Sequence, residues 1–359
     1  MFRVLRRCRV ISQCRAACMA AMLVACAGPA WSSDKQEAAT QWLQGMIQDA
    51  LMSRNVEWLE KTSEQYRTKK VRMPSGRWSL ETFYNTLERD NCVDPEGNIG
   101  EWLVELLQKW QQAYPTSPAP SIVLASCHYA AASQLRGVGY AHEIWDDNLA
   151  PMFENLKEAV AILQKNKALA SRDPHWYAVM ARTQLYLNAP DVEFWGNIET
   201  AIRFEPLYYS YYLDGFFRTL PRWGGSYAQA ERWARRASAR TSADYGDTMY
   251  ARSALSIRRI HTDLEILNDF KFDWVRLKKG MLDMFETQQT PDFQHTMEFV
   301  EMSCAYRDVE QARKVWNIWK MATPDWPEFD PAMHCAAQRA QAVEPELHAL
   351  PPTRDREKL

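Results

Sequence analysis

This 359-residue chain contains little glycine and carries a small net charge. Only 13 residues are glycine, which excludes a collagen-like fibre. The formal net charge of −2 and the 12% aromatic content exclude an intrinsically disordered chain, and this charge balance predicts no nucleic-acid partner. Beyond the N-terminus, no apolar run approaches the roughly 20 residues that a membrane-spanning helix needs. A chain with 47% apolar residues can instead bury a large core.

Short motifs that mark catalysis or cofactor binding are also missing from the sequence. There is no GxxxxGK(S/T) phosphate loop, no HExxH zinc motif and no GxSxG hydrolase motif. The seven histidines are scattered without metal-site spacing, and no CxxC pair points to zinc. We therefore expect no cofactor, no metal and no enzymatic activity.

The N-terminus resembles an export signal. Five arginines and no acidic residue precede the short apolar run 16–25, and small residues follow it. We expect a signal peptide over residues 1–32 and a periplasmic or secreted mature protein. Two outcomes stay open: peptidase cleavage at the small residues of Ala30–Ser32, or lipidation of Cys26 at the lipobox-like Leu23–Cys26. Lipidation would anchor the protein in the bacterial envelope.

Four cysteines lie beyond residue 32, namely Cys92, Cys127, Cys304 and Cys335. An even number in an oxidising compartment favours disulfides with three open pairings, and four buried free thiols are the alternative. Cys304 and Cys335 are separated by about one helical repeat, which places them in neighbouring helices of a stack. We favour a Cys304–Cys335 bridge over the cross-pairings.

Helical periodicity dominates the mature chain. Apolar residues recur at three- and four-residue spacing, while period-two strand patterns and Asn-Gly hairpin signals are missing. The predicted helices are Gln41–Leu51, Glu101–Ala113, Phe153–Leu163, Trp176–Leu187, Phe194–Phe204, Tyr227–Ala239, Trp274–Phe285, Phe293–Ala305 and Val309–Met321.

Predicted helix starts recur along the chain. An acid or hydroxyl residue precedes proline at four places, because proline suits the first helical turn and the preceding side chain can cap it. Spacings between these starts drift from 32 to about 47 residues, a range typical of stacked helical pairs. The predicted starts are Asp173-Pro174, Glu205-Pro206, Thr290-Pro291 and Asp330-Pro331, with Asp244-Tyr245 as a start that lacks proline.

The expected fold class is all-α, a degenerate tetratricopeptide-like helical-repeat stack, or α-solenoid. In such a stack each helical pair buries its apolar face only against its neighbours. We expect an N-terminal helical region over residues 33–120, the repeat domain over 121–343 and a flexible tail over 344–359.

A distinctive loop, Thr219–Ser226 (TLPRWGGS), follows an aromatic helix predicted over Tyr208–Phe217. Its two glycines permit positive φ angles and can close one helix, and Ser226 can cap the next. Arg222 can satisfy the carbonyl end of the preceding helix. The alternative interpretation is a loop that presents Arg222 and Trp223 to a ligand.

The aromatic helix before this loop carries aromatic side chains on all its faces. One face must be core, whereas the other could line a groove, because tyrosine combines a flat apolar ring with a polar tip. We expect Arg222 and Trp223 to line a groove with at least one tyrosine of this helix. The candidate partner-binding residues are Arg222, Trp223, Tyr208, Tyr211, Tyr212, Arg136 and Tyr140.

Three stretches resemble a known family. They are Thr219–Ser226, Leu135–Tyr140 (LRGVGY) and Asp173–Tyr177 (DPHWY). Through them residues 120–320 resemble the bacterial family described as domain of unknown function 4034, whose members are often described as tetratricopeptide-like. The resemblance implies a helical-repeat fold and an exported bacterial protein. It implies no activity, because the family has no established one.

The leading functional hypothesis is an exported binding or scaffold protein. A peptide or protein partner would lie in a groove along the first helices of each pair, with aromatic and arginine side chains as anchors. The alternative is an all-helical carbohydrate-active enzyme or glycan binder, because helical toroids also show drifting periods and many tryptophans, of which this chain has 15. Such an enzyme needs two carboxylates facing one sugar. A role in antagonism between bacteria stays open, although no residue selects it.

Overall fold

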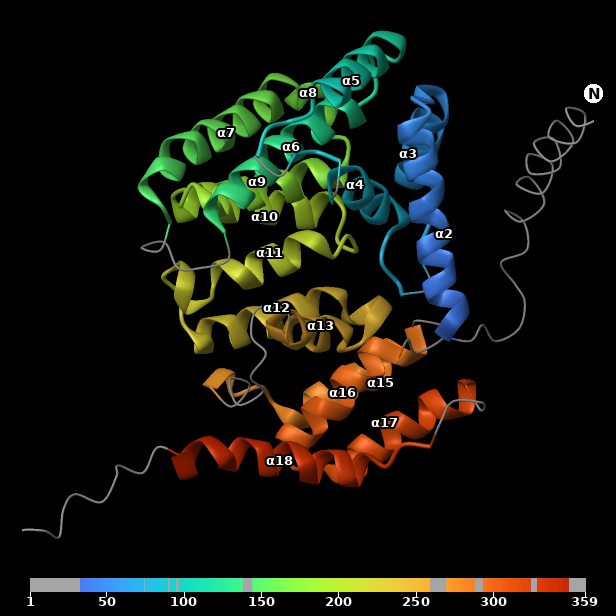
Figure 1. The fold of residues 1–359 in the computed structure, drawn as a ribbon, viewed down its shortest axis with the longest axis vertical. Helices are drawn as coiled ribbons and strands as arrows, with labels where there is room; N and C mark the ends of the chain where they lie inside the picture. The colour runs from blue at the N-terminus through green and yellow to red at the C-terminus, as the bar shows by residue number, and fades with distance from the viewer. Residues whose placement is uncertain are drawn as a thin grey trace, which may run out of the picture.

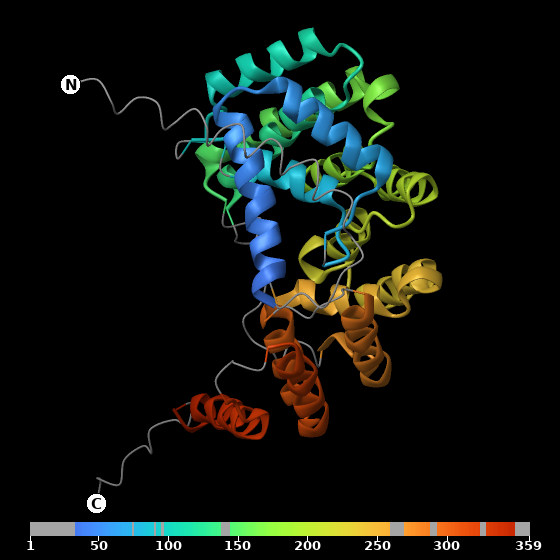
Figure 2. The ribbon, with the colours of Figure 1, turned by 90° about the vertical axis from the view of Figure 1, so that its right-hand side faces the viewer.

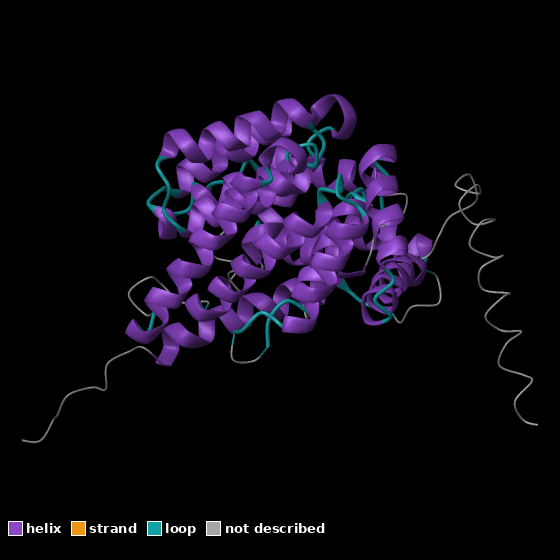
Figure 3. Cartoon of the chain, turned by 90° about the horizontal axis from the view of Figure 1, so that it is seen from above, coloured by secondary structure: helices purple, strands orange, loops and turns teal. Residues whose placement is uncertain are grey.

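The computed structural model describes residues 33–73, 75–89, 91–94, 97–137, 144–258, 269–287, 293–323 and 328–348. These residues fold into helices joined by loops, and among them no strand forms (Figure 3). Two isolated β-bridges form in the loops before and after the helix Ser79–Arg89. They pair Arg72 with Trp78 and Val93 with Ile99. The predicted signal peptide with Cys26, and Tyr140, lie outside the described residues.

The described helices follow one another in the order shown in Figure 1. They are α2 (Ser33–Met52), α3 (Val56–Lys69), α4 (Ser79–Arg89), α5 (Glu101–Ala113), α6 (Ala119–Arg136), α7 (Asp146–Lys165), α8 (Lys167–Ala170), α9 (Pro174–Tyr186), α10 (Asp191–Phe204), α11 (Ser210–Arg218), the 3₁₀ turn η2 (Pro221–Trp223), α12 (Tyr227–Tyr245), α13 (Thr248–Arg258), α15 (Trp274–Thr287), α16 (Phe293–Ala305), α17 (Val309–Ala322) and α18 (Pro331–His348).

Neighbouring helices pack on one another as a stack, which confirms the predicted all-α architecture. Helix α9 packs on α10 and α11, α11 packs on α12 and α13, and α13 packs on α15. Figure 1 shows this succession from α6 and α7 at one end to α17 and α18 at the other. The finer assignment to tetratricopeptide-like repeats stays a prediction.

The N-terminal helices lie beside this stack. Helix α2 runs along it, across the ends of the stacked helices, in both Figure 1 and Figure 2. Helix α4 packs on α2 on one side and on α6 and α9 on the other. The main core extends from Leu43 in α2 to Cys335 in α18 and continues across residue 120, where we had expected a boundary. Residue 120 itself lies in the first turn of α6.

Three predicted helix starts are confirmed by their caps. The Asp173 side chain accepts the backbone N–H of His175 at 2.8 Å at the start of α9. Asp330 accepts the N–H of Ala332 at 2.9 Å at the start of α18. Ser226 accepts an N–H in the first turn of α12 at 3.2 Å. Each cap satisfies a donor that the helix itself leaves without a partner.

Two predicted starts are wrong. No helix begins at Glu205-Pro206, because these residues form a turn whose carbonyls accept the hydroxyls of Tyr211 and Tyr212, and α11 begins at Ser210. Asp244-Tyr245 lies in the last turn of α12 rather than at a start. The helix ends there because the next residue, Gly246, has a φ of 53°. Thr290-Pro291 lies outside the described residues.

The segment predicted as a flexible tail, residues 344–359, overlaps the end of α18. Helix α18 runs from Pro331 to His348 and includes Pro345. The tail beyond residue 348 lies outside the described residues.

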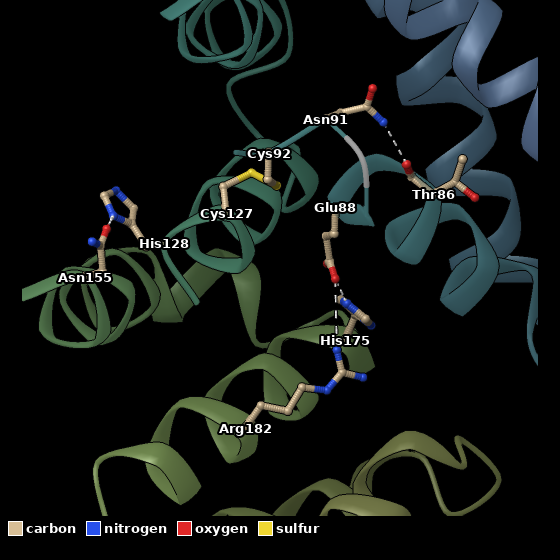
Figure 4. The surroundings of a disulfide bond; sticks show 9 residues. All are labelled: Thr86, Glu88, Asn91, Cys92, Cys127, His128, Asn155, His175 and Arg182. Atoms are coloured by element: carbon tan, nitrogen blue, oxygen red, sulfur yellow. Dashed lines mark hydrogen bonds and ion pairs between the residues drawn. A yellow bond between two sulfur atoms is a disulfide. The ribbon is translucent and has the colours of Figure 1, made fainter. Parts of the chain in front are cut away.

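Two disulfides fasten the stack. One joins Cys304 in α16 to Cys335 in α18 with Cα atoms 4.9 Å apart, which is the pairing favoured from the sequence. The other joins Cys92, just after α4, to Cys127 in α6 with Cα atoms 4.8 Å apart (Figure 4). Both Cα separations are within the usual range for a disulfide.

Candidate functional site

A surface pocket of about 520 Å³ lies where the loop after α11 meets α10 and α12. Its walls combine indole rings with guanidinium groups, and we call it the tryptophan–arginine pocket. Six side chains define it: Trp195, Trp223, Trp233, Arg218, Arg232 and Arg236.

The loop Thr219–Ser226 forms one wall of this pocket, and its glycines make the tight connection between helices that the sequence predicted. Gly224 has a φ of 84°, a conformation that L side chains rarely adopt. A Cβ on Gly225 would collide with the carbonyl oxygen of Thr219. The loop closes with the Ser226 N–H donating to Thr219 O at 2.9 Å. This folding leaves Trp223, from η2, at the pocket wall.

Two tryptophans form the floor. The ring centroids of Trp195 from α10 and Trp233 from α12 are 4.8 Å apart. The Trp233 indole N–H donates to the carbonyl of Tyr212 at 2.8 Å, and its ring packs so closely on Gly215 that a Cβ there would collide with it. Trp233 is therefore held rigidly, while Trp195 stays half-buried.

The charges of the pocket do not balance. Arg218 is neutralised, since it pairs with Asp191 at 2.8 Å and donates to Asn188 Oδ1 and to a backbone carbonyl. Arg236 lies 5.5 Å from the Trp233 ring centroid and shares the Glu199 carboxylate with Arg240. Arg232 is exposed and has no ion-pair partner among the residues that the structure describes. Three guanidinium groups thus surround a pocket whose lining includes one carboxylate.

Arg136 supports Trp223 from behind. Its guanidinium lies 5.0 Å from the Trp223 ring centroid and 5.2 Å from that of Tyr186 in α9. The Tyr186 and Trp223 rings are themselves stacked at 5.5 Å. The structure therefore brings together two of the predicted site residues, with the buried Arg136 positioning Trp223 rather than facing the pocket.

Four predicted site residues lie elsewhere. The prediction that Tyr208, Tyr211 or Tyr212 lines a groove is wrong, because all three are fully buried and belong to the core, which was the alternative interpretation. Burial raises the pKa of Tyr212 to about 12. Arg222 is half-buried in η2 and does not line the pocket.

We call the face of the stack that carries His175 and Tyr208 the inner face. The chain's own helix α4 covers this face. Tyr84 of α4 stacks on His175 of α9 with ring centroids 4.3 Å apart, and its hydroxyl donates to Asp173 at 2.7 Å. Trp78, just before α4, packs edge-on against Tyr208 at 5.4 Å. The groove expected along the first helices of the pairs is therefore filled here by an internal segment.

Ionisable side chains beside α4 form a buried network (Figure 4). Glu88 Oε1 lies 2.9 Å from His175 Nε2, and Arg182 lies within 4.0 Å of Glu88 and 3.5 Å of Asp214. Burial opposes ionisation of Glu88, but His175 and Arg182 outweigh it and lower the pKa of this carboxyl. Burial raises the pKa of Asp214 to about 6 despite Arg182. Asp214 Oδ2 has no hydrogen-bond partner among the described residues.

The described residues contain neither a candidate metal site nor a candidate membrane span. Among them, no group of three or more His, Cys, Asp or Glu side chains could hold a metal ion. No helix in the same part of the chain is both long and apolar enough to cross a membrane.

Comparison with known proteins found no relative of this chain. No family model, curated protein or solved structure matches this chain. The resemblance to the domain of unknown function 4034 family stays a prediction.

Sequence reasoning missed most of the pocket. Trp195 and Arg218 lie on helices whose contact depends on how the stack closes, which spacing along one helix does not reveal. Arg232 and Arg236 carried a local signal, since they are four residues apart on the helix that follows the distinctive loop.

Proposed function

We propose that this protein is an exported, non-catalytic helical-repeat protein that binds a protein partner through the tryptophan–arginine pocket. The observation that carries this proposal is the contrast between an open pocket with three indole rings and three guanidinium groups and an inner face filled by α4. Tryptophan and arginine are the residue types that most often dominate the energetics of protein interfaces.

Preorganisation of the pocket supports the same proposal. Trp233 is fixed by its hydrogen bond to Tyr212 O, and Trp223 by the stack with Arg136 and Tyr186. Side chains that are already ordered lose little rotamer entropy when a partner binds. The pocket can therefore contribute more of its contact energy to affinity than a flexible surface could.

Export is part of the proposal. Two disulfides between buried cysteines fit an oxidising compartment such as the periplasm. The arginine-rich start and the small residues before position 33 supply the signal, with either cleavage or lipidation of Cys26 as the outcome. Membership of the domain of unknown function 4034 family would agree with this location.

A non-catalytic role fits the carboxylates near the pocket. Asp191 is the single carboxylate of the lining, and it is ion-paired with Arg218. A two-carboxylate glycosidase mechanism needs a second acid across the sugar. Glycan binding without catalysis is the second candidate function, and the half-buried indole rings of Trp195 and Trp223 favour it because sugars stack on flat apolar surfaces.

The test compares partner retention by Trp223→Ala with that by the matched control Trp145→Ala. Trp145 is 78% exposed, precedes α7 and is not among the residues that line the pocket. The mature protein and both variants are immobilised, incubated with envelope extract, and their bound proteins quantified by mass spectrometry. We expect one set of proteins on wild type and Trp145→Ala that Trp223→Ala loses. Equal retention by all three would refute the proposed function.

A further inference from the structure

We infer that the tryptophan–arginine pocket takes an acidic segment of its protein partner, with carboxylates on the α12 side and an apolar side chain against the indole rings. This inference rests on the proposed function and specifies the chemistry of the occupant. It is carried by an excess of guanidinium groups over carboxylates on the α12 side of the pocket.

The charge excess is concentrated on α12. Arg218 is satisfied by Asp191 and by acceptors on the α9–α10 connection. Glu199 of α10 is shared by Arg236 at 3.5 Å and Arg240 at 2.8 Å, so one carboxylate faces two guanidinium groups. Arg232 adds a further cation with no ion-pair partner within the described part of the chain.

The spacing of these cations fits carboxylates. Arg232 and Arg236 are one turn apart on α12, so both guanidinium groups project from one face of the helix toward the pocket. Arginine pairs with carboxylate through two parallel N–H···O bonds, which gives geometry as well as charge. Two acidic side chains of one extended segment could therefore be bound side by side.

The indole rings add an apolar requirement and strengthen the ion pairs. Trp195 and Trp223 are half-buried rings that border the same cavity as the arginines. An apolar side chain inserted there would displace water, and charge pairs are stronger where water is excluded. The occupant is thus an acidic segment with an aromatic or aliphatic residue between its acids.

Asp191 sets the orientation of that segment. It lies on the opposite side of the pocket, at the start of α10, and is 74% exposed in its side chain. A carboxylate of the partner placed beside it would be repelled. The acids of the occupant must therefore lie on the α12 side and its apolar residue toward α10.

The test uses a blocked synthetic peptide, Glu-Glu-Phe-Glu-Glu, and its Gln-Gln-Phe-Gln-Gln counterpart. Binding to the mature protein is measured by calorimetry up to about 1 mM peptide, an affinity range that short segments reach. We expect the acidic peptide to bind at least about tenfold more tightly than the glutamine peptide, with weaker binding at high salt.

Charge reversal at the pocket supplies the second arm. Arg232→Glu and Arg236→Glu should each weaken the acidic peptide about tenfold or more, because each removes an attraction and adds a repulsion. Arg313→Glu, on the exposed side of α17, is the control with the same change of net charge and should leave binding unchanged. Arg232→Lys should retain part of the affinity.

The outcomes separate this inference from the proposed function. No binding of the acidic peptide, equal binding of the glutamine peptide, or equal effects of Arg232→Glu and Arg313→Glu would overturn the inference. If the envelope partner is lost by Trp223→Ala yet is insensitive to Arg232→Glu, the proposed function stands and the acidic occupant is wrong. Displacement of the partner by a neutral oligosaccharide, with no effect of charge reversal, would identify a glycan site instead.

Discussion

The inner face of the stack and the tryptophan–arginine pocket both combine aromatic with ionisable side chains, with opposite results. On the inner face, Tyr84, His175 and Tyr208 are fully buried and find their partners inside the chain. In the pocket, Trp223 is half-buried, and Arg232 is exposed without an ion-pair partner among the described residues. The two regions therefore differ in whether their aromatic and ionisable side chains already have partners within the chain.

The largest effect expected from this comparison is on stability. Tyr208→Ala removes a fully buried ring that contacts Trp78 and hydrogen-bonds His175 at 2.7 Å, so the free energy of unfolding should fall by about 3–5 kcal/mol. Trp223→Ala, which truncates a half-buried ring, should lower it by less than half as much. Urea unfolding of both variants measures the difference, and equal losses would contradict the assignment of the two regions.

The disulfide between α16 and α18 should affect stability without affecting binding. Its sequence separation of 31 residues corresponds to about 3–4 kcal/mol in the chain-entropy model. Replacing Cys304 and Cys335 together by serine should lower the free energy of unfolding by that amount. Binding of the acidic peptide at a temperature where the variant stays folded should match wild type, since the pocket lies on α10 and α12. A parallel loss of binding would show that the two ends of the stack are coupled.

The buried carboxyl of Asp214 should make the free energy of unfolding depend on pH. Its pKa is raised from 3.8 to about 6, so its contribution to stability is complete below its unfolded pKa and is lost as the pH rises through about 6. The groups facing it are Arg182, Glu81 and His175. The wild-type stability should decrease by about 3 kcal/mol between acidic and neutral pH because of this group, and Asp214→Asn should remove that decrease. Unfolding curves at several pH values test this, and an unchanged slope in Asp214→Asn would contradict it.

The smallest expected effect is at the support of the pocket. Arg136→Ala removes a cation stacked on Trp223 and Tyr186, an interaction of about 1 kcal/mol. Peptide affinity should therefore fall a few-fold. Arg136→Lys, which keeps the cation, should weaken binding less. An Arg136→Ala variant with wild-type affinity would show that Trp223 needs no support.

Periodic surface helices were the most predictable part of the fold. Two predicted helices, Glu101–Ala113 and Phe293–Ala305, match α5 and α16 in both bounds. Their apolar residues recur at helical spacing and form one face opposite a polar face. Helix α6 was missed because it is itself rich in small residues and most of its first half is buried, which leaves little hydrophobic periodicity. Helix α4 carried a readable signal in its apolar residues at helical spacing, Leu80, Phe83, Tyr84 and Leu87.

The candidate site was predictable only where its signal is local. The glycine-rich turn and the cap by Ser226 follow from residues adjacent in sequence. The burial of Tyr208, Tyr211 and Tyr212 does not, because a short helix with aromatic residues on all faces does not reveal which face meets another helix. The pairing of Arg218 with Asp191 across two helices is likewise a product of tertiary packing.

Hydrogen–deuterium exchange with and without the acidic peptide tests most directly whether the pocket, rather than the inner face, is the binding surface. Bound peptide should slow exchange in Thr219–Ser226 and in the first turns of α12, while exchange in α4 and in the N-terminal half of α9 stays unchanged. Slower exchange centred on α4 and α9, with none at α12, would contradict the account.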